Sequence, residues 1–401
     1  MVRSEAVIDL GAIRRNVSVL RSGTAAEVMA VVKADGYGHG LVPAARAALA
    51  GGATWLGVAF LEEALALRGA GILAPVLSWL AVPGEDVAAG VAADVDLSVS
   101  APWALAEVVA AARETGQQAR VHLKVDTGLC RGGATAADWP ELVTVAAKAA
   151  AADEIEVVGI WSHFAYADSP GHPTIAGQVA AFTEAVAAAR RLGVDPPVRH
   201  LANSAATLTL PAAHFDLVRP GIAVYGLTPV PPEPYGLEPA MTLRSRVALT
   251  KRVPAGSGVS YGHVHVTDRE TGLALVPLGY ADGVPRAATS VGPLWLAGRR
   301  RTVTGRVCMD QFVVDVGDDD VAAGAEVVLF GPGRDGEPTA QDWADALGTI
   351  SYEIVTRIGA RVPRTHVDRA RADRTQGDRA RADRTGAQGD RPHGRAAGTD
   401  R

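Results

Sequence analysis

Cysteine, long apolar runs and lysine are all scarce in this chain of 401 residues, and each scarcity excludes a class of protein. The two cysteines, Cys130 and Cys308, are too few for a disulfide framework or a zinc site, which suits a reducing cytoplasm. The N-terminus lacks the apolar core of a signal peptide, and charges interrupt the alanine-rich segments too often for a bilayer span. We therefore expect a cytoplasmic protein that has no membrane contact and no bound metal.

An excess of positive charge is also missing. The chain has 39 lysines and arginines against 44 aspartates and glutamates, so its formal net charge of −5 gives no basic surface for nucleic acid. The lysines number only four, so any lysine chemistry must use Lys33, Lys124, Lys148 or Lys251.

Apolar residues are plentiful, at 48% of the chain with a mean hydropathy of +0.11, and they fall into a regular alternation. Strand-like runs end near residues 32, 59, 80, 99, 125, 162, 202 and 218, and helical patterns lie between them. Eight strands with intervening helices over residues 11–230 predict a (β/α)8 barrel. An open, doubly wound sheet is the alternative, because one sequence does not reveal whether the strands close.

The alternation of strand-like and helical segments ends at a proline-rich linker at 228–239. Short β-type segments separated by glycine and aspartate turns predict a second, mainly β domain over 231–364, closed by a helical or irregular segment at 339–358. Residues 1–10 read as a strand that packs with this second domain. Residues 365–401 repeat Arg-Ala-Arg-Ala-Asp-Arg-Thr and have few apolar residues, so we predict a disordered tail.

Polar residues recur where the predicted barrel strands end. Lys33 follows the first strand and precedes a glycine-rich turn, a place where burial favours the neutral amine that Schiff-base chemistry needs. Other such positions are Lys124–Arg131 after the fifth strand, His163 after the sixth, Asn203 and Ser204 after the seventh, and Arg219–Ile222 after the eighth. Each has an ordinary structural explanation on its own, but a barrel brings all of them to one rim.

The last two of these loops predict a phosphorylated ligand, because loops after strands seven and eight commonly bind phosphate in such barrels. Ser204 is expected to cap the helix that follows it, and Gly221 and Ile222 offer backbone N–H groups.

These motifs resemble those of alanine racemases, pyridoxal-phosphate enzymes of fold type III. The resemblance covers residues 4–364 in order and is carried by Ala30–Gly40, Lys124–Arg131, Ser162–Ala165, Ala202–Ala205, Val218–Gly226, Val259–Gly262, Gly279–Gly283, Arg306–Asp310 and Ser351–Glu353. It implies an N-terminal barrel, a β-rich C-terminal domain and a head-to-tail homodimer with shared active sites. It also implies production of D-alanine for peptidoglycan.

The resemblance assigns the cofactor site residue by residue. Lys33 would hold pyridoxal 5′-phosphate as an internal aldimine, Arg131 would approach its phenolic oxygen and Arg219 its pyridine nitrogen. Its phosphate would be held by Tyr37, Ser204, Gly221, Ile222 and Tyr352, and His163 and Asn203 would complete the cofactor site.

It also implies interconversion of L-alanine and D-alanine by two-base proton transfer at the Cα of the cofactor aldimine. Lys33 would serve the face of the D-substrate, and Tyr261 of the other subunit would serve the face of the L-substrate. A chain from Tyr261 through His163 to Arg219 would favour the phenolate. Arg131 and the backbone N–H of Met309 would bind the substrate carboxylate, while Tyr280 and Tyr352 would narrow the entrance.

Lys124 is expected to carry a carbamate, as the equivalent lysine does in some family members; the alternatives are an unmodified lysine paired with Asp126 and a chloride in the place of the carbamate. Leu129-Cys130 departs from the Met-Gly that the family often has there.

Three other functions stay open. The first is a serine or broad-specificity racemase. The second is an amino-acid decarboxylase of the same fold, against which Arg219 and Tyr261 argue, and the third is a non-enzymatic carrier of pyridoxal phosphate, which would leave the second domain unexplained.

Overall fold

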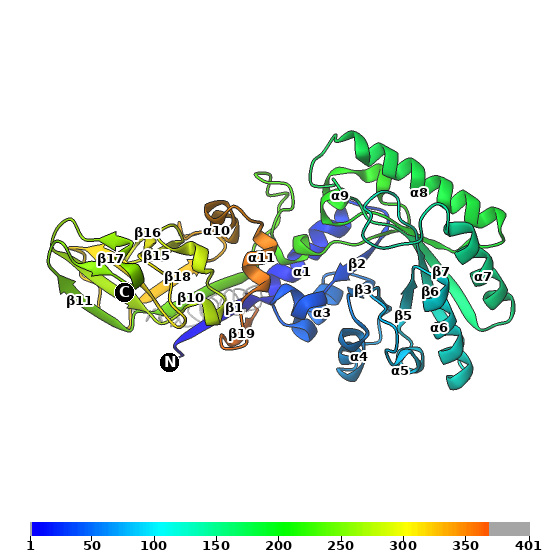
Figure 1. Ribbon diagram of the computed structural model, residues 1–401, viewed down its shortest axis with the longest axis horizontal. Helices are drawn as coiled ribbons and strands as arrows, with labels where there is room; N and C mark the ends of the chain where they lie inside the picture. Colours follow the sequence, from blue (N-terminus) through cyan, green and yellow to red (C-terminus); the bar gives the residue numbers. More distant parts are fainter. Residues whose placement is uncertain (1, 369–401) are drawn as a thin grey trace, which may run out of the picture.

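The computed structural model describes residues 2–368 and shows a barrel beside a β-rich domain (Figure 1). Eight parallel strands form the barrel sheet in the order β8-β7-β6-β5-β4-β3-β2-β9. They are β2 (Glu27–Val31), β3 (Trp55–Val58), β4 (Val76–Ser78), β5 (Asp96–Val99), β6 (Ala119–Lys124), β7 (Ile155–Trp161), β8 (Val198–His200) and β9 (Leu217–Val218).

The two ends of this sheet come together beyond β8 and β9, where Asn203 and Arg219 form a parallel bridge. The Arg219 N–H donates to the Ala202 carbonyl at 2.9 Å, and the Asp216 N–H donates to the Arg199 carbonyl at 3.0 Å. The prediction of a (β/α)8 barrel is therefore confirmed, and the open-sheet alternative is wrong.

Helices cover the outside of the barrel and alternate with its strands (Figure 1). They are α1 (Leu10–Ser22), α3 (Leu41–Ala50), α4 (Leu61–Gly69), α5 (Val87–Ala92), α6 (Pro102–Thr115), α7 (Trp139–Ala151), α8 (Pro173–Arg191) and α9 (Ser204–Thr209). Pro102 and Pro173 open α6 and α8, where the absent N–H costs no hydrogen bond. In the described residues no helix has both the length and the apolarity to cross a bilayer.

The β domain is built on a nine-stranded sheet in the order β11-β14-β17-β16-β15-β18-β10-β1-β19. Its strands are β10 (Met241–Arg246), β11 (Leu249–Val253), β14 (Thr271–Val276), β15 (Pro293–Leu296), β16 (Arg299–Thr304), β17 (Phe312–Gly317) and β18 (Glu326–Phe330), with β1 (Ser4–Asp9) and β19 (Arg364–Val367) from the two ends of the described chain. A separate hairpin joins β12 (Gly258–Val259) to β13 (His265–Val266). The helices α10 (Ala340–Leu347) and α11 (Ser351–Thr356) follow β18, and Figure 1 shows α11 where the two parts meet.

The first strand of the chain belongs to the second sheet. β1 pairs antiparallel with β10, with Ala6 opposite Leu243, and parallel with β19, with Ala6 opposite Arg364. β19 was not expected, because the predicted disordered tail begins at residue 365 and this strand continues to Val367. The predicted boundary is wrong by these residues, and the remainder of that tail, from residue 369, lies outside the described residues.

β19 also connects the β domain to the first loop of the barrel. The Arg364 guanidinium donates to the carbonyls of Gly38 at 3.0 Å, Gly359 at 2.7 Å and Val362 at 2.8 Å. The His366 Nε2 lies 2.9 Å from the His39 carbonyl, which only accepts, so this nitrogen carries the proton. The loop that contains the lysine signature is thus held from both parts of the chain.

We expect Arg364→Ala to lower the free energy of unfolding by about 2 kcal/mol, because several partly buried carbonyls lose their donor at once. Urea unfolding followed by circular dichroism measures this loss. Arg113→Ala is the matched control, since Arg113 forms a single ion pair with Glu154 and its side chain is 69% exposed. Its effect should stay below about 1 kcal/mol. Equal effects of the two substitutions would contradict the role given to Arg364.

Candidate active site

A cavity of about 610 Å³ opens at the carboxyl ends of the barrel strands. Most of its lining comes from residues at or just after these ends, and α11 adds two more side chains. The lining residues are Val31, Lys33, Ala34, Tyr37, Trp79, Leu80, Lys124, Arg131, Gly132, Trp161, His163, Asn203, Ser204, Arg219, Gly221, Ile222, Tyr352 and Thr356. All ten residues predicted for the cofactor site therefore line one cavity, together with Lys124.

Lys33 starts a left-handed turn, α2 (Lys33–Tyr37), directly after β2. Four successive residues, Ala34, Asp35, Gly36 and Tyr37, have φ between 52° and 60°. Only glycine adopts this conformation freely, and each of the other three costs about 1–2 kcal/mol. A strained turn of this kind persists only where the surrounding contacts fix it.

Hydrogen bonds from three directions fix this turn. Glu63 of α4 accepts the N–H of Ala34 at 2.6 Å, and the Asp35 side chain accepts the N–H of Leu41 at 2.8 Å. The His39 ring nitrogen Nδ1 lies 3.0 Å and 2.9 Å from the carbonyls of Gly36 and Tyr37, so it carries the proton. Lys33 is consequently attached to a rigid support.

Positive charge is concentrated in the cavity. Lys33, Lys124, Arg131 and Arg219 all line it, and no carboxylate is found among its described lining residues. Burial, and then the charge of Arg131, lower the pKa of Lys33. Burial, Arg219 and Arg131 together lower the pKa of Lys124 to about 8. The cavity therefore fits a ligand with several negative charges, and its amines lose their protons more easily than ordinary lysines.

Trp161, at the end of β7, is an important lining residue that the sequence analysis missed. The Lys124 Nζ lies 4.4 Å from the centroid of its ring, and the Arg219 Cζ lies 4.8 Å from the same centroid. An aromatic face stabilises nearby cations, so Trp161 helps to hold two of them in close proximity. The signal was available in the sequence, since Trp161 directly precedes Ser162-His163 at a predicted strand end.

Arg219 is buried at the back of the cavity, where burial lowers its pKa to about 9, so it is still charged at neutral pH. Its Nη2 donates to the Ser162 carbonyl at 2.7 Å and lies 3.2 Å from the His163 Nδ1. Because arginine only donates, the proton of neutral His163 must be on Nε2. Burial and the charge of Arg219 hold the pKa of His163 well below its usual value, so the ring is neutral.

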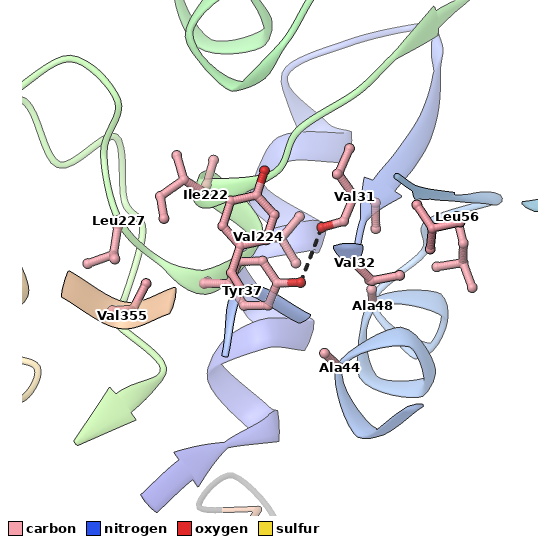
Figure 2. Close-up of a cluster of buried hydrophobic side chains, with 14 of the residues drawn as sticks. Val31, Val32, Tyr37, Ala44, Ala48, Leu56, Ile222, Val224, Leu227 and Val355 are labelled. Carbon is pink, nitrogen blue, oxygen red and sulfur yellow. Dashed lines mark hydrogen bonds between the residues drawn. The ribbon is translucent and has the colours of Figure 1, made fainter. Parts of the chain in front are cut away.

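The end of the cavity predicted to bind phosphate is formed by Tyr37, Ser204, Gly221, Ile222 and Tyr352. The Ser204 Oγ accepts the N–H of Gly221 at 2.7 Å. A Cβ on Gly221 would lie 2.3 Å from the Tyr37 hydroxyl oxygen, so the chain needs glycine here. Figure 2 shows Tyr37 among buried apolar side chains that include Ile222 and, from α11, Val355.

One detail of the prediction for this region is wrong. Ser204 does not cap α9; Asn203 does, because its Oδ1 accepts the N–H of Ala206 at 3.1 Å. The reason is the position of the strand end, which places Asn203 in extended backbone one residue earlier than expected. The Ser204 hydroxyl is thus left to bridge the loops that follow β8 and β9.

The loop that carries Arg131 is organised by Asp126. One oxygen of its carboxylate accepts the N–H groups of Gly128 at 2.9 Å and of Leu129 and Cys130 at 3.1 Å. Cys130 has a φ of 55°, a left-handed conformation that suits glycine better than a residue with a side chain. Asp126 is thus engaged with its own loop, where it orders the segment leading to Arg131.

Tyr261, Tyr280 and Met309 lie outside the cavity, on the β domain. They are exposed, by 72%, 43% and 53% respectively. The chain brings them to one region, because the Tyr280 N–H donates to the Cys308 carbonyl at 3.0 Å and the Ser260 Oγ lies 3.3 Å from the Cys308 Sγ. The structure therefore divides the predicted site residues into a set in the barrel cavity and an exposed set on the β domain.

Three comparisons with known proteins agree on the family. Residues 8–229 match the family model of the alanine racemase N-terminal domain, and residues 240–366 match that of the C-terminal domain. An alanine racemase of Frankia casuarinae is 66% identical over 372 residues, which cover 91% of this chain and 97% of the relative. The crystal structure of the alanine racemase from Streptomyces lavendulae superposes with a TM-score of 0.91 at 56% identity, covering 92% of this chain and 97% of that one. The solved structure of the alanine racemase from Streptomyces coelicolor superposes with a TM-score of 0.90 at 58% identity, covering 91% of this chain and 98% of that one. The chain belongs to the alanine racemase family of isomerases.

Proposed function

We propose that this protein interconverts L-alanine and D-alanine with pyridoxal phosphate bound in the barrel cavity. The observation that carries the proposal is the convergence of a glycine–tyrosine–serine pocket and four cationic side chains, Lys33 among them, on a cavity whose described lining includes no carboxylate. Phosphate, the phenolic oxygen of the cofactor and the carboxylate of an amino acid are the negative charges that such a cavity would neutralise.

The cofactor would be held from several sides. Lys33, with its lowered pKa, would be the amine that joins to it, and Arg131 would approach its phenolic oxygen. Asn203, which also lines the cavity, would complete the cofactor site. The phosphate of the cofactor would be bound by Tyr37, Ser204, Gly221, Ile222 and Tyr352. Pyridoxal phosphate supplies an electron-withdrawing ring that acidifies the Cα proton of an attached amino acid.

Arg219 would face the ring nitrogen of the cofactor and would keep its own proton. Because arginine does not readily give up that proton, the ring nitrogen would stay unprotonated and the ring would withdraw electrons less strongly than with a carboxylate partner. This limits side reactions and argues against the decarboxylase alternative.

Two bases exchange the proton from opposite faces of the substrate. Lys33 serves one face, and the partner subunit's Tyr261 serves the other. The His163 Nε2–H, fixed by Arg219, is the donor that favours the phenolate of that tyrosine. Tyr261 lies between β12 and β13 and does not line the cavity of its own chain. A second copy of the chain would therefore have to bring this tyrosine to the cavity.

The partner subunit would also complete the substrate pocket. Arg131 and the backbone N–H of the partner's Met309 would bind the substrate carboxylate, and the partner's Tyr280 together with Tyr352 would narrow the entrance to favour a methyl side chain. We propose a head-to-tail homodimer in the cytoplasm that supplies D-alanine for peptidoglycan. A carrier of pyridoxal phosphate would not need the exposed set on the β domain.

The purified protein, incubated with pyridoxal phosphate and L-alanine, should form D-alanine until the two enantiomers are equal, as chiral chromatography will show. L-serine should react at least about tenfold more slowly, because an added hydroxyl must enter a pocket sized for a methyl group. Equal rates with both would support a broad-specificity racemase. Cofactor binding without any D-alanine would support the carrier.

Mixing two inactive variants tests the shared site. Lys33→Ala should abolish the visible absorbance of lysine-bound cofactor, and Tyr261→Phe should retain the cofactor but convert L-alanine poorly. In hybrid dimers of the two, one of the two sites has both native bases, so random mixing should restore about a quarter of the wild-type activity. No recovery, despite hybrids confirmed by tagged co-purification, would place Tyr261 in its own subunit or outside the mechanism.

Lys124 is proposed to carry a carbamate, whose negative charge would lie between Arg131 and Arg219. A pKa of about 8 leaves more neutral amine to react with carbon dioxide than an ordinary lysine has, and this neutral fraction rises with pH, reaching one half near pH 8. Labelling with ¹³C-bicarbonate should give a carbamate signal in NMR spectra, absent in Lys124→Met and retained in Lys148→Met, where an exposed lysine is removed. A spectrum without this signal would leave an unmodified lysine or a chloride at the site.

A further inference from the structure

A continuous line of buried polar side chains runs through the barrel behind the cavity. It consists of Arg219, His200 of β8, His122 of β6 and Asp96 of β5, which we call the histidine relay. Arg219 is 4% exposed, Asp96 1%, and both histidines 0%. The interior of such a barrel is normally packed with branched apolar side chains, so this composition requires an explanation.

The distances along the relay are those of hydrogen bonds. The Arg219 Nη1 lies 3.2 Å from the His200 Nδ1, and the His200 Nε2 lies 2.9 Å from the His122 Nδ1. The His122 Nε2 then lies 3.1 Å from the Asp96 Oδ2. Beyond Asp96, Arg120 joins the relay to the opposite mouth of the barrel, where it also pairs with the half-exposed Glu156.

Arg219 determines the direction of every bond in this line. Because arginine only donates, the His200 Nδ1 must accept, and the proton of a neutral His200 is then on Nε2. That Nε2–H donates to the His122 Nδ1, so the His122 proton is on Nε2 and donates to Asp96. The reverse order would put two N–H groups face to face at Arg219, and a buried clash of this kind is costly.

The charges at the two ends agree with this direction. Burial raises the pKa of Asp96, but the hydrogen bonds from His122 and Arg120 and the charge of Arg120 outweigh it, so the pKa is lowered overall and the group is a carboxylate. Burial and the charge of Arg219 hold the pKa of His200 well below its usual value. The two histidines thus form a neutral bridge between the buried cation Arg219 and the buried anion Asp96.

Packing keeps both imidazole rings in place. His200 stacks on Trp161 with 5.6 Å between ring centroids and 3° between planes, and His122 meets the edge of Trp55 at 81°. A Cβ on Gly159 of β7 would lie 2.5 Å from the His122 Nδ1, so a glycine makes room for this ring. The rings therefore have little freedom to turn and exchange donor for acceptor.

We propose that Asp96 is a positioning residue that acts through His122 and His200 to hold the Arg219 guanidinium in its orientation at the back of the cavity. This inference rests on the proposed function, in which Arg219 meets the ring nitrogen of pyridoxal phosphate. When the carboxylate is lost, only Arg219 still sets the direction of the line, and His122 gains access to the opposite tautomer, in which an N–H of His200 would be turned against Arg219 and displace the guanidinium. Asp96 itself lies behind the cavity and contacts no substrate.

Asp96→Asn tests the proposal against Glu156→Gln, the matched control that also changes one carboxylate partner of Arg120 to an amide. In Asp96→Asn we expect kcat for alanine to fall by about tenfold or more with little change in KM. The visible absorbance of the bound cofactor and its pH profile should shift as well. Glu156→Gln should match the wild type. A merely structural role would lower the melting temperature and the cofactor content without moving the pH profile of the protein that retains cofactor.

Asp96→Asn with the kcat and the pH profile of the wild type would overturn the proposal, and so would a loss confined to melting temperature and cofactor content. If that variant fails to fold, ¹⁵N NMR of histidine side chains in the wild-type protein decides the matter. Both His122 and His200 should be neutral with the proton on Nε2, and a proton on either Nδ1 would refute the relay. This measurement needs no turnover, so it also separates failure of the relay from failure of the proposed racemase activity.

Discussion

The constraint on which this site depends is a buried guanidinium that has no carboxylate partner among residues 2–368. Arg219 follows the last and shortest barrel strand and lies where the ends of the sheet meet. Since it donates in every direction, it forces His163, His200 and the neighbouring carbonyls to accept. The tautomers of the two histidines beside and behind the cavity follow from this one group.

Positive charge in the cavity has a cost that a ligand removes. Lys33, Lys124, Arg131 and Arg219 repel one another in a partly buried space, and burial together with this repulsion lowers the pKa of both lysines. A ligand with phosphate, phenolate and carboxylate groups relieves that repulsion, which makes binding favourable and pre-organises the amines for chemistry. The aromatic face of Trp161 stabilises the cations of Lys124 and Arg219 and so offsets part of the cost of their repulsion.

The two parts of the chain have different tasks. The barrel provides a rigid, charged cavity and the strained turn that carries Lys33, and the β domain provides α11 and β19, which hold that turn from the other side. A Cβ on Gly38 would lie 2.5 Å from the Val355 carbonyl, so turn and helix are in direct contact. The exposed set of Tyr261, Tyr280 and Met309 lies on the same β domain but outside the cavity, which is the arrangement that a shared site between two copies requires.

The sequence by itself determined the barrel, the positions of its strand ends and the polar residues that these ends bring to the cavity. Strand ends are visible as local patterns, and parallel strands bring their carboxyl ends to one rim, so Lys33, His163, Ser204 and Arg219 could be placed together without coordinates. The tertiary structure alone decided the Asn203 cap, the pairing of β19, the stacking on Trp161 and the line from Arg219 to Asp96. Asp96, His122 and His200 look like isolated polar residues inside three strands, because their contact depends on how far neighbouring strands are staggered as the barrel closes. That stagger is a property of the closed sheet, and no local pattern of residues encodes it.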